Sequence, residues 1–337
     1  MTNFVKYLLL LILVLGLIAM IFYVYQISAP VSTDKSVVNF EIKPGESVKQ
    51  ISQELFKEHL IRSKFYFEVY VWQKGWEKRF IAGRHELSRD MNIKEIAKQL
   101  VKVGGTEMTI TIIEGWNNKE IGNYLEQQGL VSQQDFLATA SQDLTSSYKE
   151  QFDFLSDMPG LVSLEGYLFP DTYRVFKNAT TEEIIKKMLD NFEQKLTNDL
   201  KLKIKDQGQT IFEIITLASI IEKEVRNPKD MKMVADIFYK RLKKGIALQS
   251  DATVNYITGK GLVQPTAEDI EINHPYNTYK YHGLPSGPIS NPGLSAVMAA
   301  IEPTENSYYY FLTTEDGTVI YSKTYEEHLR NKARYLK

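Results

Sequence analysis

The sequence contains no cysteine. That absence excludes thiol catalysis, cysteine-ligated metal, disulfide bonds and an acylated lipoprotein cysteine. It does not identify the redox compartment, since an oxidising space does not require disulfides. An excess of either charge is also missing, because 40 Lys and Arg residues against 42 Asp and Glu residues give a formal net charge of −2. Nucleic acid is therefore not an expected partner.

Three common catalytic motifs are missing as well. The histidines form no H-x-x-x-H pair of the kind that binds zinc on a helix. Residues 283–287, Gly-Leu-Pro-Ser-Gly, lack the Lys-Ser/Thr that follows in a phosphate loop, and no G-x-S-x-G nucleophile elbow is present. The sequence therefore predicts neither a metal site nor a cofactor. The five histidines are His59, His85, His274, His282 and His328.

One long apolar run is present at the N-terminus. Residues 7–27 carry no charge, and about 20 such residues span a bilayer as a helix. A cleaved signal would have a shorter run and a clear small-x-small site, which Ile27-Ser28-Ala29 matches poorly. Lys6 precedes the run, which favours a cytoplasmic N-terminus. We predict a single-pass protein of the cell membrane (the inner membrane in a Gram-negative cell), with its tail and anchor at 1–28 and the remainder outside.

An internal repeat follows a polar linker at 29–38. Residues 40–63 and 110–132 match at an offset of 70 positions. Each copy has the pattern of a strand, a glycine turn and a capped helix. Strand–helix units of this size cannot bury their apolar faces alone, so we expect both copies to pack together as one α+β module at 39–145. The matched pairs are Gly45 and Gly115, Ile51 and Ile121, Leu55 and Leu125, and Leu60 and Leu130.

Compact strand–turn–helix modules of this kind resemble LysM-type glycan-binding units. Trp72, Trp76 and Trp116 are the three tryptophans of the chain, and all fall in this half. Their rings could stack on sugar faces or belong to the core. A glycan-binding module and a spacer that sets the distance from the membrane are therefore both open.

The remainder, 146–337, is predicted to be a second α+β domain. The polar stretch 141–147 marks the boundary. A helix is expected from the Thr180 cap to about residue 200, two short β segments at 308–313 and 319–322, and a final amphipathic helix at 325–336.

Residues 216–225 form a helical pattern with two acidic residues on an otherwise apolar segment. At about 100° per residue, Glu222 and Glu224 point to nearly opposite sides. Glu224 lies beside Ile220 and Ile221, whereas Glu222 lies beside smaller residues. A carboxyl group against apolar side chains keeps its proton to higher pH, as a general acid requires. The alternative is that both are solvated helix positions.

Loops rich in glycine and proline occupy 259–293. Tyr276-Asn-Thr-Tyr279 and the turns of 283–293 can present hydrogen-bonding groups and flat rings from a fixed backbone. Such a surface suits a sugar chain, and a well-ordered connector is the alternative.

Five blocks of the sequence, in the same order and spacing, resemble the MltG (YceG-like) family of endolytic peptidoglycan transglycosylases, and the likeness covers nearly the whole chain. The resemblance implies cleavage of the MurNAc–GlcNAc β-1,4 bond inside nascent peptidoglycan strands, with 1,6-anhydro-MurNAc ends. It implies peptidoglycan strands as substrate and peptidoglycan synthases as further partners. The blocks are 164–173, 218–224, 248–253, 276–279 and 283–293.

The resemblance places the catalytic glutamate at Glu224, with Glu222 two positions away as the alternative. Glu224 would protonate the leaving oxygen and then accept the proton of the sugar's own C6 hydroxyl as it attacks C1. A hydrolase would need a second carboxylate about 5–9.5 Å away. The residues expected to fill that role, to orient Glu224 or to contact substrate are Glu165, Gln249, Asp251, Asn277 and Tyr279.

Two other functions stay open at this level. A muramidase that uses Glu224 with Asp251 or Glu165 would hydrolyse the same bond and leave a reducing end. A non-catalytic scaffold of the cell-wall synthesis machinery would bind glycan without cleaving it.

Overall fold

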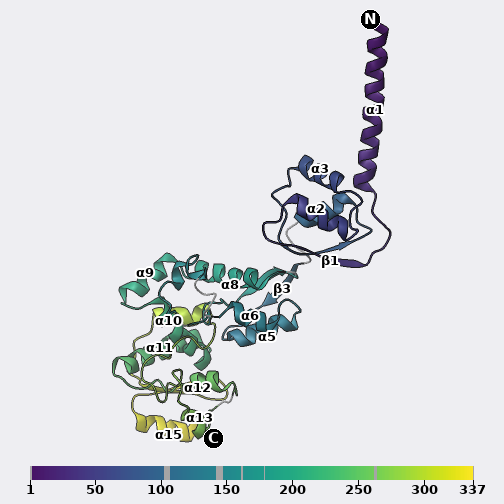
Figure 1. Ribbon diagram of the computed structural model, residues 1–337. Coiled ribbons are helices and arrows are strands. Elements are labelled where there is room, and N and C mark those ends of the chain that lie inside the picture. The colour runs from purple at the N-terminus through teal and green to yellow at the C-terminus, as the bar shows by residue number, and fades with distance from the viewer. Residues whose placement is uncertain are drawn as a thin grey trace. The chain divides into compact units, whose positions relative to one another are not determined.

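A computed structural model describes residues 2–101, 107–141, 147–160, 162–177, 179–261 and 264–336. The chain divides into two compact units, Met1–Met108 with Phe176–Ala179 and Thr109–Val175 with Thr180–Lys337 (Figure 1). Helices dominate both units, and the described strands form three two-stranded sheets. The predicted α+β class is confirmed.

The N-terminal unit is built on one antiparallel strand pair. β1 and β2 pair over six residues each, with Phe40 opposite His85. The helices supply most of the core, in which Leu55, Phe67 and Leu100 are fully buried. The elements are α1 (Thr2–Ser28), β1 (Val37–Ile42), α2 (Val48–Lys57), α3 (Lys64–Lys74), β2 (Gly83–Ser88) and α4 (Ile93–Val101).

Helix α1 extends away from the strands, and its last turns meet α3 and α4 (Figure 1). Tyr23 donates a hydrogen bond to Gln73 of α3 at 2.5 Å, and the rings of Phe22 and Tyr66 lie 6.0 Å apart. Within the described ranges, no helix combines the length and the apolar character that crossing a membrane requires. The anchor expected at 1–28 stays a prediction.

The C-terminal unit begins with the second repeat copy, and its strand β3 pairs with β4. Its helices enclose α10, whose residues from Ile214 to Ile221 are all buried and which packs mainly against α14. The elements are β3 (Glu107–Thr111), α5 (Asn118–Gln127), α6 (Gln133–Thr139), η1 (Asp153–Leu155), β4 (Thr172–Phe176), α8 (Thr181–Lys195), α9 (Asn198–Asp206), α10 (Ile211–Glu224), α11 (Pro228–Lys243), α12 (Asp251–Thr258), α13 (Ala267–Ile270), α14 (Leu294–Ile301), β5 (Tyr310–Thr313), β6 (Val319–Ser322) and α15 (Tyr325–Tyr335).

The two repeat copies share their turn and cap geometry. Gly45 and Gly115 take φ values of 82° and 80°, which only glycine adopts readily. Ser47 and Asn117 then close capping boxes on α2 and α5 with the residues three positions on. The apolar positions matched between the two copies on these helices are fully buried, namely Ile51, Leu55, Ile121 and Leu125.

The copies do not share one compact unit, although the sequence favoured a joint module. The first lies in the N-terminal unit, whereas residues from Thr109 onward belong with α10. Each strand finds its partner further along the chain, β2 for β1 and β4 for β3, so neither copy needs the other to complete a sheet. Most of the boundary expected at 141–147 lies outside the described residues.

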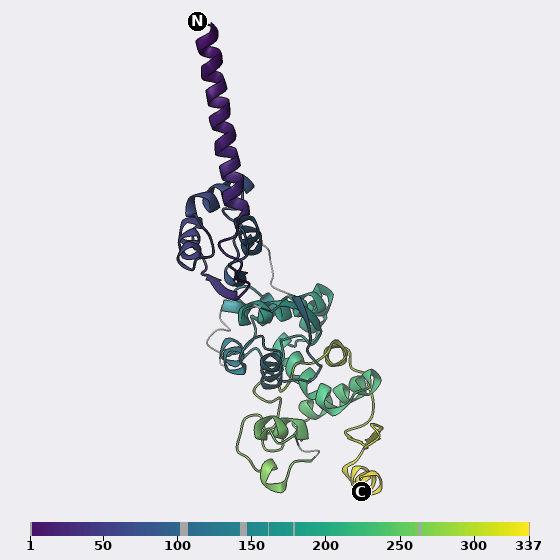
Figure 2. The same cartoon turned by 90° about the vertical axis from the view of Figure 1, so that its right-hand side faces the viewer.

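The remaining expected elements are present. Thr180 caps α8 through a capping box with Glu183, but that helix ends at Lys195 rather than near residue 200, and Thr197 caps a separate helix, α9. The predicted β segments form the antiparallel β5–β6 hairpin, and α15 follows it. The hairpin and α15, yellow in Figure 2, form one edge of the C-terminal unit.

Candidate active site

Helix α10 delivers Glu224 at its final position. The helix starts at a Thr210 capping box and is a nearly continuous apolar stretch. It stops because Val225 turns into extended backbone, and Pro228 opens α11 three residues later. Thr313 of β5 donates a hydrogen bond to the Glu224 carbonyl at 3.2 Å, which satisfies one of the carbonyls left free at a helix end. Glu224 is thereby fixed at an ordered helix terminus.

The Glu224 carboxyl group is held by one hydroxyl and destabilised as an anion. Ser250 donates a hydrogen bond to its Oε1 at 2.5 Å. Burial raises the pKa of Glu224 to about 7, the negative charge of Asp251 adds to the rise, and the Ser250 hydrogen bond opposes it. A carboxyl group with this pKa exchanges its proton near neutrality, so it can serve as both general acid and general base.

Glu222 has a different environment. Its Oε2 accepts a hydrogen bond at 2.9 Å from the backbone N–H of Gly293, the residue that caps α14. No side chain of α14 caps that helix itself, so the Glu222 carboxylate satisfies a free N–H and faces the positive end of the helix dipole. Burial and the charge of Glu114 raise the pKa of Glu222, and the Gly293 hydrogen bond opposes them.

Ser250 is a functional residue that the sequence reasoning missed. It is the N-cap of α12 and is almost fully buried. Its N–H donates to the Thr278 hydroxyl oxygen at 3.0 Å, and its carbonyl accepts a hydrogen bond from Thr253 at 2.8 Å. The only available signal was its position in block 248–253, one residue before Asp251. These contacts fix the hydroxyl that touches Glu224.

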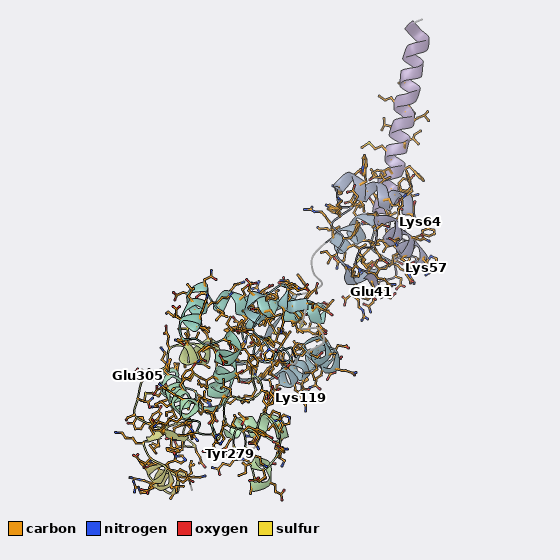
Figure 3. All side chains as sticks on the ribbon, turned by 60° about the vertical axis from the view of Figure 1, so that its left-hand side comes forward. Glu41, Lys57, Lys64, Lys119, Tyr279 and Glu305 are labelled. Carbon is orange, nitrogen blue, oxygen red and sulfur yellow. The ribbon has the colours of Figure 1, made fainter. Side chains whose placement is uncertain are left out.

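Asp251 and Tyr279 lie together. The Tyr279 hydroxyl donates a hydrogen bond to Asp251 Oδ1 at 2.5 Å. Burial and this contact raise the pKa of Tyr279, so the ring keeps its proton. Asp251 is near enough to Glu224 to raise its pKa. Tyr279 is labelled in Figure 3 among the side chains of the C-terminal unit. The structure therefore brings Glu224, Asp251 and Tyr279 into one cluster.

Gln249 is exposed and takes a left-handed φ of 53°, which is uncommon for a residue with a side chain. Its Oε1 accepts a hydrogen bond from Arg241 Nη2 at 2.6 Å, while Arg241 Nε donates to the Ala247 carbonyl. The Arg241 guanidinium also lies 5.4 Å from the ring centre of Tyr310. Strained backbone is often kept at functional sites. Here the two hydrogen bonds from Arg241, a residue that the sequence did not single out, stabilise the strained conformation of Gln249.

Asn277 is placed differently from Tyr279. Its side chain is fully buried, and its amide nitrogen donates to the carbonyls of Ile270 and Ile272. Its amide oxygen accepts the Tyr279 N–H at 3.0 Å. In this conformation Asn277 closes the loop that carries Tyr279, and a direct substrate contact for Asn277 stays a prediction.

Glu165 lies in a second polar cluster. Both its oxygens accept the backbone N–H of Asn118, at 3.0 and 3.1 Å. Asn291 Nδ2 donates to Oε1 at 3.1 Å, and the Tyr256 hydroxyl donates to Oε2 at 3.3 Å. Burial raises its pKa to about 8 against these hydrogen bonds, and the charge of Glu120 adds to the rise. At neutral pH Glu165 is therefore mainly protonated.

Helix α12 connects the two clusters. Ser250 and Asp251 at its start reach Glu224 and Tyr279, and Tyr256 near its end reaches Glu165. Tyr256 is five positions after Asp251, which is about 7.5 Å along a helix.

The chain is similar to known proteins over most of its length. The sequence model of the YceG-like family matches residues 40–334. The chain is 35% identical over 326 residues to the endolytic murein transglycosylase of Bacillus subtilis (strain 168), covering 91% of this chain and 87% of that relative. It is 31% identical over 340 residues to the endolytic murein transglycosylase of Streptococcus pneumoniae (strain D39), covering 93% of this chain and 61% of that relative. This chain thus spans less than two thirds of the pneumococcal relative. A 2.6 Å crystal structure of a YceG-like protein from Listeria monocytogenes matches with a TM-score of 0.61 and 34% identity, covering 88% of this chain and 100% of that one.

Proposed function

Because this chain belongs to the YceG-like family, we propose that it is a lytic transglycosylase that cleaves peptidoglycan strands internally. It cuts the MurNAc–GlcNAc β-1,4 bond and leaves a 1,6-anhydro-MurNAc end, which terminates or trims the strand. The observation that carries the proposal is the Glu224 carboxyl group, fixed at the end of α10 with its pKa raised to about 7.

One carboxyl group is enough for this reaction. Protonated Glu224 transfers its proton to the glycosidic oxygen as the bond from that oxygen to C1 breaks. The resulting carboxylate accepts the proton of the C6 hydroxyl of the same sugar, and that oxygen forms the new bond to C1. The attack is intramolecular, so it gains from proximity, and Glu224 ends protonated for the next cycle.

The neighbouring residues have supporting roles in this proposal. Asp251 raises the pKa of Glu224 and is itself oriented by Tyr279. Gln249 is exposed, and Tyr279, like Asp251 and Glu224, is partly exposed, so Gln249 and Tyr279 are the proposed substrate contacts beside the acid. Glu165 is proposed to act on substrate from the other end of α12, and Asn277 to act by holding Tyr279.

Hydrolysis is the second candidate, and the position of Asp251 favours it. A carboxylate that lies near the acid could serve as the second group of a muramidase. Mass spectrometry of digested uncross-linked strands separates the two reactions, because transglycosylation gives anhydro ends and hydrolysis gives reducing ends. Anhydro ends from the wild-type protein support the proposal, and reducing ends alone reject it.

The Glu224→Gln variant tests whether the protein is an enzyme at all. The amide keeps the shape of the side chain but cannot donate an acidic proton, so product formation should be lost. Glu222→Gln is the matched control, since the same change two residues away should leave the products unchanged. If Glu224→Gln cleaves as well as wild type and leaves glycan length in cells unaltered, the non-catalytic scaffold is the better description.

Membrane attachment is part of the same proposal. Residues 7–27 are uncharged, and α1 exposes large apolar side chains such as Leu13 at 61% and Ile21 at 65%. A contiguous exposed apolar surface calls for an apolar partner, so we place the anchor in the cell membrane with the catalytic part outside. Resistance of the protein to alkaline extraction from membranes would support this placement, and release would reject it.

The domain roles are proposed as an anchor at 1–28, a linker at 29–38, LysM-like glycan binding by the first repeat copy of the stretch 39–145, and catalysis by a domain that includes 146–337. On α3, the Trp72 side chain is 71% exposed and available for a sugar face, whereas Trp76 packs on Tyr70. The second repeat copy contributes the N–H of Asn118 to Glu165, so it also takes part in the C-terminal unit. Peptidoglycan synthases are the proposed protein partners.

A further inference from the structure

The C-terminal unit contains a cavity of about 660 Å³ next to Glu165. Its walls come from the start of α5, the end of α6, the end of α12 and the loop that carries His274. The volume lies within the range of about 300–1,000 Å³ that is usual for small-molecule sites. The lining residues that matter here are Asn117, Leu137, Ser163, Tyr256, Thr258 and His274.

The lining suits an uncharged ligand that has both polar and apolar faces. Asn117, Ser163 and Thr258 offer neutral hydrogen-bonding groups, and Leu137 offers an apolar surface. Glu165 at the wall is mainly protonated at neutral pH, because burial raises its pKa to about 8. A sugar ring with hydroxyl and acetamido groups has this mixed character.

One wall of the cavity is aromatic and ordered. The ring of Tyr256 lies 5.1 Å from that of Tyr276, and the His274 ring lies 5.7 Å from the same tyrosine. His274 Nδ1 also accepts the Tyr276 N–H at 3.3 Å. Rings fixed in this way provide flat apolar area at little cost in side-chain entropy. Lys119 is exposed at the rim, labelled in Figure 3.

The cavity is joined to the Glu224 cluster by α12. Tyr256 and Thr258 line the cavity, whereas Asp251 at the start of the same helix adjoins Glu224. Asp251 and Thr258 are seven positions apart, which is about 10.5 Å along the helix and within about 20° around it, a spacing on the scale of two sugar rings. A glycan that lies along α12 from Glu224 would therefore reach the cavity.

We propose that this cavity is a remote saccharide subsite, which binds an N-acetylated hexosamine unit of the strand being cut at Glu224. The inference rests on the proposed function. Binding energy gained far from the reacting bond can be used to position the bond at the acid, so the subsite would make the enzyme prefer strands long enough to fill both places. That preference gives cleavage within strands a structural basis.

The test is the dependence of activity on strand length. Leu137→Trp should fill the cavity, and Thr258→Trp fills it from another wall in case the first variant does not fold. Each should lower kcat/KM about tenfold on long uncross-linked strands, equivalent to about 1.4 kcal/mol, and leave the shortest cleavable strand unaffected. The control is Leu202→Trp, the same change at an exposed position on α9. An equal loss at all lengths, or no loss, overturns the subsite.

A binding measurement separates this inference from the proposed function. The disaccharide of N-acetylglucosamine is titrated into the full-length Glu224→Gln variant by calorimetry, alone and combined with Leu137→Trp or Leu202→Trp. Binding that only Leu137→Trp abolishes supports the subsite, and binding that survives Leu137→Trp rejects it. If wild type cleaves no strand, the proposed function fails, and the titration still decides whether the cavity binds sugar.

Discussion

The Ser250 hydroxyl donates a hydrogen bond to Glu224 Oε1 at 2.5 Å. The contact joins the start of α12 to the end of α10 and depends on the buried Thr253 and Thr278, which hold the Ser250 backbone. A donor stabilises the charged form of the carboxyl group. Ser250 therefore limits how far burial can raise the pKa of Glu224. It also fixes the orientation of the Glu224 carboxyl group.

Replacing Ser250 by alanine should raise the pKa of Glu224 above its value of about 7 and lower the maximal rate. The alkaline limb of the kcat/KM profile should move to higher pH, while the rate at the optimum falls about tenfold because the acid is less well oriented. Ser322→Ala removes another fully buried hydroxyl, in β6, and serves as the control. A Ser250→Ala profile that keeps the wild-type limb would contradict this role.

The pH dependence of the wild-type enzyme follows from the same group. Transglycosylation begins with protonated Glu224, so kcat/KM should fall as pH rises through about 7, with a slope of one proton. The free energy of unfolding should depend on pH through the same group, since the pKa of Glu224 in the folded protein is raised above its usual value of 4.5. Its contribution to stability is complete below pH 4.5 and is lost as pH rises through about 7.

The Glu224→Gln variant tests whether Glu224 makes the protein less stable as the pH rises. At acidic pH it should unfold with nearly the wild-type free energy, because both side chains are neutral. Above pH 8 it should be the more stable protein, by on the order of 3 kcal/mol, since it avoids burying a charge. Urea unfolding at pH 4.5 and pH 8.5 measures the difference. A variant that is less stable than wild type at pH 8.5 would show that Glu224 is stabilised as an anion.

Much of the fold could be read from the sequence where the information is local. The 70-residue offset identified equivalent turns at Gly45 and Gly115, because a left-handed turn and a capped helix are determined within a few residues. The partners of the strands could not be read in this way. β1 pairs with β2 and β3 with β4, and these long-range pairings separate the copies into different compact units.

The residues of the candidate site could also be predicted from the sequence only in part. Helical periodicity gave Glu222 and Glu224 opposite directions, and the structure gives them different partners, Gly293 and Ser250. Asn277 is expected to contact substrate because of its loop; in the structure its amide nitrogen donates to nearby carbonyls, and the substrate contact stays a prediction. Composition indicates that a loop is rigid, but it does not indicate which of its polar side chains produces the rigidity.

Glu222 gives a prediction that separates structure from catalysis. Glu222→Ala removes the acceptor of the Gly293 N–H at the start of α14, so stability should fall by about 1–3 kcal/mol. The kcat/KM of the folded fraction should stay close to wild type. Denaturant unfolding and product assays on one preparation provide both values. A hundredfold loss of kcat/KM with unchanged stability would instead assign Glu222 to the chemistry.

Gly166 follows Glu165 and allows a close approach between segments. It has a φ of 90°, and an added Cβ would lie 2.5 Å from Pro288 Cβ and 2.9 Å from Ile215 Cγ2. Gly166→Ala would force apart the Glu165 segment, α10 and the loop before α14. We expect a loss of about 2 kcal/mol or more, with strain and overpacking combined.

Gly208→Ala is the matched control for that change, because Gly208 has a φ of 69° but no atom within 4 Å of an added Cβ. It should cost about 1 kcal/mol from backbone strain alone. The additional loss of stability in Gly166→Ala, relative to Gly208→Ala, is the cost of the close contact. Thermal unfolding of both variants measures this difference. Because Glu165 adjoins Gly166, the pKa of Glu165 should fall toward its usual range as water gains access. Equal destabilisation by the two variants would mean that the Pro288 loop can withdraw freely, in which case the walls around Glu165 and Glu224 are not rigidly coupled.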